Sequence, residues 1–301
     1  MKENSLRIRT VAPSGQFSWE NYQKGVLWLR DLGAEIVSEA KLRSSDMLNL
    51  NGSDQERLDE LQEALCDESC DVVWVARGGY GLIRIIERLD LSHVRKIPLV
   101  IGFSDVTVLL AHLWTRYYRT SLHGPILTRL SQEPESVLQA LQLILNKQSQ
   151  MVSYPKFFVA CGDSPKNIEG NVIPANLCML QHLIGTPSMP NLENSILFFE
   201  EVNEHPYQID RMLTHLQMSN SLDGVKGVVL GYFMQTPETD NFQDEVKQVF
   251  CAKFSSLNIP VFSGFAFGHK SPNWPLPFGA QVVIEVNGQE AQLFIREEVL
   301  L

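Results

Sequence analysis

Short apolar runs alternate with segments of helical periodicity through the first half of the chain. The apolar runs are typical of buried strands, and they lie at residues 6–12, 34–37, 71–76 and 98–103. Segments with apolar residues at helical spacing predict helices, and they lie at 19–32, 55–65, 82–89 and 105–117. Repeated strand–helix units of this length predict a parallel sheet with helices on both faces.

The second half of the chain has a different order of elements. Strand-like runs lie at 195–199, 227–232, 280–286 and 291–295, and helical segments near 176–183, 207–217 and 243–254. Between the two halves, the stretch 147–165 interrupts the alternation with polar residues, glycine and proline, which predicts a boundary there. We therefore expect an α/β protein with one domain at 1–150 and a second, α+β domain at 165–301.

The composition of the chain excludes some classes of binding partner and indicates a cellular compartment. The formal charge of −10 argues against a nucleic-acid or anionic-membrane partner, because phosphate binding needs a basic surface. No apolar run approaches the roughly 18 residues of a membrane span, and residues 1–10 lack the apolar stretch of a signal peptide. The five cysteines are odd in number and sit mostly in apolar or helical surroundings, so we expect reduced thiols in the cytoplasm.

The sequence Ile101-Gly-Phe-Ser-Asp105 follows one predicted strand and precedes a predicted helix. A strand that ends in Gly-x-Ser and turns directly into a helix exposes the serine hydroxyl at the edge of the sheet. The same turn directs free backbone N–H groups at that point, which suits a nucleophile beside an oxyanion hole. Ser104 is therefore a candidate nucleophile. Alternatively, Ser104 and Asp105 only cap the helix, since both residue types are favoured there.

Two more turns are predicted at the same edge of the sheet. Arg77-Gly-Gly-Tyr-Gly81 follows the preceding strand, and His123-Gly-Pro125 follows a short strand that starts near Thr120. Glycine-rich turns offer successive N–H groups to an anion, although this one lacks the spacing of a P-loop or of a dinucleotide site. Because ligands of parallel sheets bind beyond the carboxyl ends of the strands, the clustering favours a catalytic site over a simple helix cap.

A serine nucleophile needs a base, and that base needs an orienting group. Among the seven histidines, His269 has the best context, because it follows a strand that ends in small residues and precedes a stiff, proline-rich loop. The pair Glu200-Glu201 ends an apolar strand and supplies a candidate carboxylate. Glu204-His205 could make this region a metal cluster, but no second ligand pair accompanies it, so we expect no metal. Cys161 is a weaker candidate nucleophile than Ser104, because no helix is predicted after it.

Taken together, these segments resemble the serine LD-carboxypeptidases, the muramoyltetrapeptide carboxypeptidase family of peptidoglycan recycling. The shared motifs follow one another in the family's order along nearly the whole chain. They are Val11-Ala-Pro-Ser-Gly15, Ala76-Arg-Gly-Gly-Tyr-Gly81, Gly102-Phe-Ser-Asp105, His123-Gly-Pro125, Leu183-Ile-Gly-Thr-Pro187, Glu200-Glu-Val-Asn-Glu-His-Pro-Tyr207 with Asp210-Arg-Met-Leu213, and Phe267-Gly-His269.

The resemblance implies a flavodoxin-like first domain, a β-rich second domain and a homodimer. It assigns a serine-histidine-glutamate triad to Ser104, His269 and Glu200, with the substrate in a cleft between the domains. The implied reaction is the release of D-alanine from the end of a small peptide, a muropeptide, through an acyl-enzyme. Neither a cofactor nor a metal takes part in the implied reaction.

The resemblance also implies how the substrate is held. An oxyanion hole is assigned to the backbone N–H groups of Asp105 and Gly79. Substrate-binding candidates are Arg77, Gly78 and Asn176, with the Arg77 guanidinium as a partner for the terminal carboxylate of the peptide.

One motif departs from the family's pattern. Where relatives carry Gly-Gly-Asn, this chain has Pro174-Ala175-Asn176, which predicts a different loop near the cleft and bears on substrate preference. Two alternative functions stay open. One is a peptidase similar to the microcin-C immunity proteins, which acts on peptidyl or aminoacyl nucleotides. The other is a non-catalytic protein that binds an anionic ligand at the glycine-rich turn.

Overall fold

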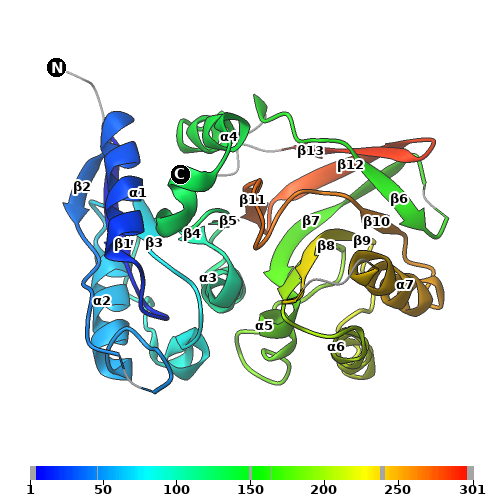
Figure 1. Ribbon diagram of the computed structural model, residues 1–301, viewed down its shortest axis with the longest axis horizontal. Coiled ribbons are helices and arrows are strands. Elements are labelled where there is room, and N and C mark those ends of the chain that lie inside the picture. The colour runs from blue at the N-terminus through cyan, green and yellow to red at the C-terminus, as the bar shows by residue number, and fades with distance from the viewer. Residues whose placement is uncertain (1–4, 46, 149–150, 164, 238–240, 297–301) are drawn as a thin grey trace.

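A computed structural model describes residues 5–45, 47–148, 151–163, 165–237 and 241–296. The chain folds around two β-sheets that lie side by side (Figure 1). The first sheet has the strand order β11-β5-β4-β3-β1-β2, and the second closes into a barrel in the order β10-β6-β13-β12-β7-β8-β9. No helix in the described part of the chain is long and apolar enough to cross a bilayer.

The first sheet is parallel except at one edge. Its parallel strands are β1 (Arg7–Val11), β2 (Glu35–Ser38), β3 (Val72–Val75), β4 (Leu99–Gly102) and β5 (Ser121–His123). The edge strand β11 (Leu276–Phe278) comes from far along the chain and pairs antiparallel with β5. The central strands β3 and β4 are fully buried, in keeping with a sheet that is covered on both faces.

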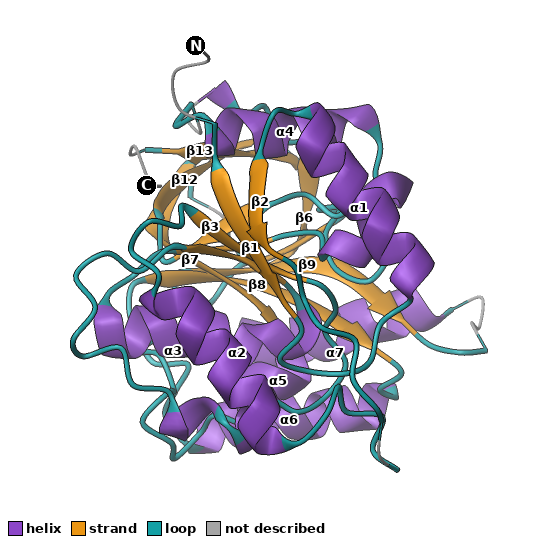
Figure 2. Ribbon diagram, turned by 90° about the vertical axis from the view of Figure 1, so that its left-hand side faces the viewer, coloured by secondary structure: helices purple, strands orange, loops and turns teal. Residues whose placement is uncertain are grey.

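Helices cover both faces of this sheet (Figure 2). On one face lie α1 (Trp19–Asp31) and α4 (Glu135–Leu145), and on the other α2 (Asp54–Cys66) and α3 (Thr107–Tyr117). Short 3₁₀ helices complete the connections, at η1 (Leu82–Arg84), η2 (Ile86–Arg88), η3 (Ser104–Val106) and η4 (Leu127–Gln132). Helix α2 begins with a capping box, in which Ser53 and Glu56 satisfy each other's backbone N–H groups.

The barrel mixes parallel and antiparallel pairs. Strands β7 (Asn167–Asn176), β8 (Ser195–Val202), β9 (Gly227–Met234) and β10 (Val261–Ser263) run parallel to one another. Antiparallel pairs with β6 (Phe157–Cys161), β12 (Gln281–Asn287) and β13 (Glu290–Ile295) close it. Helices α5 (Leu177–Gln181), α6 (Pro206–Met218) and α7 (Phe242–Ser255) lie on the same side of the molecule as α2 and α3 (Figure 2).

The predicted α/β architecture is confirmed, with local differences. The segment 82–89 forms two short 3₁₀ helices rather than one α-helix, since its three isoleucines are stiff at χ1 and lower helix propensity. Pro174 to Asn176 end strand β7 instead of forming a loop. These residues pair with β8 on one side, whereas the pairing of β7 with β12 on the other side stops at Asn171. Pro174 is tolerated there because proline fits a strand segment that has a neighbouring strand on one side only. Helix α4 and strands β6, β7 and β11 were not predicted.

Two of the five cysteines are not the reduced thiols that we expected. Cys161 at the end of β6 and Cys251 on α7 form a disulfide, with their Cα atoms 5.9 Å apart. Helix α7 packs against β6 in the fold, but the two residues are 90 positions apart, so their spacing carried no sign of the pair. The other three, Cys66, Cys70 and Cys178, are free thiols.

Candidate active site

Ser104 lies at the sharp turn between β4 and the helical segment η3–α3. Its backbone has φ of +68°, a left-handed conformation that is uncommon for a residue with a side chain. Gly102 makes the turn possible, because a Cβ there would lie 2.9 Å from the Val106 side chain. The result is a half-buried serine in strained backbone at the carboxyl end of a central strand, a feature that is common at functional sites.

Three side chains from distant parts of the sequence form a chain of hydrogen bonds. The Nε2 atom of His269 lies 3.1 Å from Oγ of Ser104, and its Nδ1 atom lies 2.6 Å from Oε2 of Glu200. Glu200 comes from β8 and is fully buried, whereas the His269 side chain remains 19% exposed. The structure thus brings together all three residues that the resemblance assigned to a triad.

Glu200 occupies a β-bulge. The pairing of β8 with β9 changes register between Phe199 and Glu201, and such bulges re-aim side chains. Both adjacent carboxylates are buried as a result: Glu200 meets His269, and Glu201 bonds to the start of α5.

The segment that carries His269 is held on several sides. Asn273 accepts a hydrogen bond from the Gly268 amide at 2.8 Å, and the Arg129 guanidinium donates to the His269 carbonyl at 2.7 Å. The imidazole also meets the ring of Phe103 edge-on, with centroids 5.0 Å apart. Gly268 lies against Glu200, where a Cβ would come within 2.7 Å of the Glu200 Cβ. These contacts fix the imidazole between the carboxylate and the serine.

The carboxylates around His269 set its protonation. Burial by itself lowers the pKa of His269, but the charge of Glu200 and its hydrogen bond, with the charge of Glu201, raise it above the ordinary value of 6.5. Burial beside Glu200 in turn raises the pKa of Glu201 to about 7. The imidazolium form of His269 is therefore stabilised by its surroundings.

The glycine-rich turn after β3 packs directly on Ser104. A Cβ on Gly78 would lie 3.3 Å from Oγ of Ser104, and Gly79 has φ of +108°. The amide of Asp105 belongs to the first turn of η3, where N–H groups have no partner within the helix. The amides of Gly79 and Asp105 thus belong to the two segments that border Ser104.

The side chain of Asp105 has a different task from its amide. Its buried carboxylate accepts hydrogen bonds from Ser14 Oγ at 2.6 Å and from the Leu82 amide at 3.0 Å. Burial raises the pKa of Asp105, and these two hydrogen bonds oppose the shift. Because Ser14 follows β1 and Leu82 follows the glycine-rich turn, Asp105 ties three loops together beneath Ser104.

Sequence reasoning missed a buried bridge between the two halves of the site. The Asn176 amide N–H donates to Thr107 Oγ1 on α3 at 3.1 Å, and Asn176 Nδ2 donates to Glu201 at 3.0 Å. Glu201 also accepts from the Cys178 amide at 2.8 Å. This links the helix behind the serine with the strand that carries Glu200. Glutamate pairs commonly end strands in solvent, so the sequence held no sign of this role for Glu201.

The remaining predicted residues lie around this centre. Arg77 is exposed, and its guanidinium donates to the Gln16 carbonyl. Both ends of the Asn176 side chain are bonded within the protein, since its oxygen also accepts from the Met179 amide. His123 is fully buried between the rings of Phe103 and Phe267, and burial lowers its pKa to about 4, so it is neutral.

Comparisons with known proteins agree with this geometry. Residues 8–124 match the family described as the LD-carboxypeptidase N-terminal domain, and residues 169–284 match the LD-carboxypeptidase C-terminal domain. The chain belongs to the LD-carboxypeptidase family. It is accordingly a hydrolase, a serine-type carboxypeptidase, which disfavours the non-catalytic binding protein considered above.

Individual proteins are similar to this one over almost the whole chain. A Synechocystis protein, named as a carboxypeptidase without a stated substrate, is 33% identical over 93% of this chain and 91% of its own. The crystal structure of muramoyltetrapeptide carboxypeptidase from Oxalobacter formigenes superposes with a TM-score of 0.81, at 27% identity, covering 97% of this chain and 99% of that one. The microcin C7 self-immunity protein MccF of Escherichia coli is 23% identical over 94% of this chain and 90% of its own.

Proposed function

We propose that this protein is a muramoyltetrapeptide carboxypeptidase, which releases the terminal D-alanine from muropeptide tetrapeptides during peptidoglycan recycling. The observation that carries the proposal is the hydrogen-bonded series Ser104–His269–Glu200, which suits acyl transfer to serine. The likeness to the Oxalobacter formigenes enzyme supports the choice of substrate.

In the proposed mechanism, His269 accepts the proton of the Ser104 hydroxyl through Nε2 as Oγ attacks the carbonyl of the L-to-D peptide bond. Glu200 accepts the Nδ1–H hydrogen bond, which fixes the tautomer and stabilises the imidazolium that forms. His269 then donates its new proton to the amine of the leaving D-alanine. Water, activated by the same imidazole, hydrolyses the acyl-enzyme and frees Ser104.

The backbone N–H groups of Gly79 and Asp105 form the oxyanion hole in this proposal. Their segments flank Ser104, and donors preorganised in this way strengthen as charge develops on the carbonyl oxygen. We further propose that Arg77 binds the terminal carboxylate, with Gly78 giving the peptide close access to the backbone. For Asn176 we propose a positioning role through Glu201 in place of direct substrate contact, because both ends of its amide are engaged.

The test is the release of free D-alanine from the purified tetrapeptide L-Ala-γ-D-Glu-meso-diaminopimelate-D-Ala. Release by the wild type, and none by the Ser104→Ala variant, is the expected result. If folded wild-type protein releases no D-alanine, the proposed substrate is wrong. The same pair of proteins should then be assayed on peptidyl and aminoacyl nucleotides, since the likeness to MccF favours that class as the second candidate.

The proposed base gives the reaction a defined pH dependence. Because His269 must be neutral to accept a proton, kcat/KM should fall as the pH drops through its pKa. That pKa is raised, so we expect an acid limb with an apparent value above 6.5. The raised pKa also means that protonated His269 stabilises the fold below pH 6.5, and that this contribution is lost as the pH rises through the folded value. A pH–rate profile in which the acid limb lies well below 6.5 would contradict the role of the carboxylates.

Gly268 offers a test of the support behind the histidine. Alanine at this position would place a Cβ 2.8 Å from Oε2 of Glu200, in backbone with φ of +111°. We expect Gly268→Ala to lower kcat by about 100-fold, because small displacements of catalytic groups have effects of that size. Gly288→Ala is the matched control: φ there is +64°, but no atom lies within 4 Å, so only stability should change, by about 1 kcal/mol. Equal kinetic effects of the two substitutions would refute the proposed packing role.

Three properties remain proposals: a domain division at 1–150 and 165–301, a homodimer, and residence in the cytoplasm. The Cys161–Cys251 disulfide opposes the last of these, because structural disulfides are typical of oxidising compartments. Thiol counting on denatured protein taken directly from cells would decide it: five reactive thiols are expected in a reducing cytoplasm, and three if the bond persists.

A further inference from the structure

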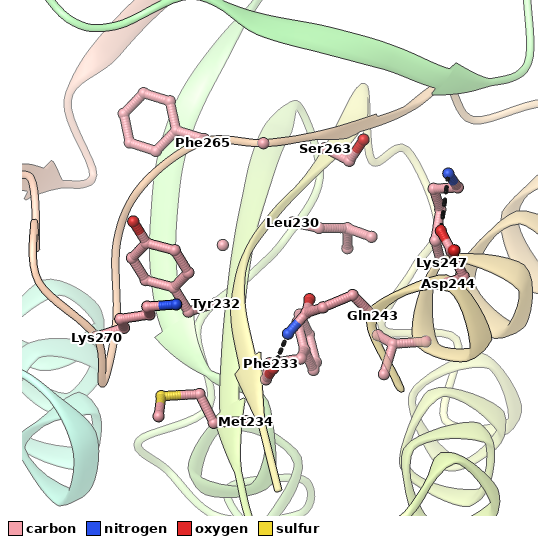
Figure 3. Close-up of a pocket in the computed structure, with 13 residues that line it drawn as sticks. Leu230, Tyr232, Phe233, Met234, Gln243, Asp244, Lys247, Ser263, Phe265 and Lys270 are labelled. Carbon is pink, nitrogen blue, oxygen red and sulfur yellow. Dashed lines mark hydrogen bonds and ion pairs between the residues drawn. The ribbon is translucent and has the colours of Figure 1, made fainter. Parts of the chain in front are cut away.

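A cavity of about 450 Å³ opens beside the catalytic segment, between β9, the first turns of α7 and the residues that follow β10 (Figure 3). Tyr232 and Lys270 form one side of this cavity, Gln243 and the Asp244–Lys247 pair the other, and Leu230 lies between them. More apolar than polar surface lines it. We call this space the β9–α7 pocket.

One wall of the β9–α7 pocket belongs to the segment that carries His269. The Tyr232 amide donates to the Phe267 carbonyl at 2.9 Å, so the segment lies on β9 like an added strand. Gly231 permits this approach, because a Cβ there would lie 2.2 Å from the Phe267 ring. Lys270, which lines the pocket, is the residue after His269. A ligand in the pocket would therefore contact the segment that carries the catalytic histidine.

The two lysines of the pocket differ in their partners. Lys247 has a carboxylate partner, with Nζ 3.4 Å from Asp244. Lys270 has no ion-pair partner among the residues that the structure describes, and its Nζ lies 5.9 Å from the centre of the Tyr232 ring. Burial raises the pKa of the Tyr232 hydroxyl, so this neighbour is neutral. In a chain with a formal charge of −10, a cation without an ion pair beside the segment of His269 is a candidate partner for an anionic group of the substrate.

We propose that the β9–α7 pocket binds the part of the peptide that precedes the scissile bond, and that Lys270 pairs with a carboxylate in that part. The inference rests on the proposed function and assigns a recognition residue for the aliphatic, carboxylate-bearing residue that precedes the terminal one in that substrate. The cavity is larger than the D-alanine that leaves, so it suits the longer part of the peptide, which forms the acyl-enzyme. Its apolar walls suit an aliphatic stem, and Lys270 suits the acid at the end of the stem.

The test compares two tetrapeptides, one with the free side-chain carboxylate of meso-diaminopimelate and one with that carboxylate converted to an amide. For the wild type, the amide should raise KM about tenfold with kcat within about twofold, the size expected for one charge-assisted contact. Lys270→Met should raise KM for the free acid by the same factor and leave the amide unchanged. Lys270→Arg should restore most of the difference.

Lys226→Met is the matched control. Lys226 is exposed and directly precedes β9, at the end of the strand away from the pocket. Its removal should therefore leave the KM for both peptides unchanged. Equal effects of Lys270→Met on the two peptides, or no effect on either, would overturn the inference. If the wild type hydrolyses neither peptide, the proposed function fails separately. Binding of the two peptides to the wild type and to Lys270→Met is then measured by calorimetry. If the free acid binds the wild type more tightly than the amide does, and Lys270→Met removes this difference, the proposed role of Lys270 is supported. If the wild type binds both peptides equally, or Lys270→Met keeps the difference, that role is refuted.

Discussion

Replacing Ser104 with alanine should lower kcat for D-alanine release by about 10⁶-fold, the size of effect seen when a triad serine is removed elsewhere. The variant retains Glu200, His269 and the flanking amides but has no hydroxyl to attack the carbonyl. The variant should still fold, because the backbone at residue 104 is left-handed, with φ of +68°, and the alanine side chain is no larger than that of serine. The measurement is single-turnover release of D-alanine together with thermal unfolding.

A serine-reactive phosphonate gives an independent readout of the same position. Wild-type protein should be labelled once, at Ser104, and Ser104→Ala should not be labelled. A residual rate within about tenfold of wild type, from a variant that unfolds at the same temperature, would remove Ser104 from the mechanism.

The second large effect is expected from Glu200→Gln, which should lower kcat by about 10⁴-fold. The glutamine amide can donate to Nδ1, which would favour the tautomer with its proton on Nε2 and leave no lone pair facing Ser104. The same change removes a negative charge 2.6 Å from the imidazole, so the pKa of His269 should fall and the acid limb of the pH–rate profile should move to lower pH.

Glu201→Gln is the control for this prediction. Glu201 is the neighbouring residue and equally buried, but its carboxylate bonds to Asn176 and Cys178 instead of His269. We expect this variant to lose stability while its kcat falls much less. If both variants lose the same activity, the two carboxylates act as one structural unit, and the specific role of Glu200 is wrong.

The features that the sequence predicted correctly are those that depend on residues close together along the chain. The Gly-x-Ser turn after an apolar strand indicated Ser104, and loop context indicated His269, which lies 3.1 Å from it in the structure. Strand–helix alternation predicted the parallel sheet, since a strand buried on both faces reads as an apolar run. Each of these signals lies within a few adjacent residues.

The features that the sequence concealed depend on contacts between distant segments. The bridge from Thr107 through Asn176 to Glu201 joins residues that are 69 and 25 positions apart. The disulfide joins Cys161 to Cys251 across 90 positions, and the β9–α7 pocket exists only where a loop lies on β9. A single sequence shows no such proximity, because the residue types involved are equally common on ordinary surfaces and strand ends.

Strand β11 has a consequence for how the protein is made. Residues 276–278 complete the edge of a sheet whose other strands all lie before residue 124. During translation, β5 must therefore leave the ribosome with one side unpaired, and it stays so until most of the chain has emerged. An open edge of this kind invites pairing with other nascent chains. A fragment that stops short of residue 276 would retain this exposed edge permanently.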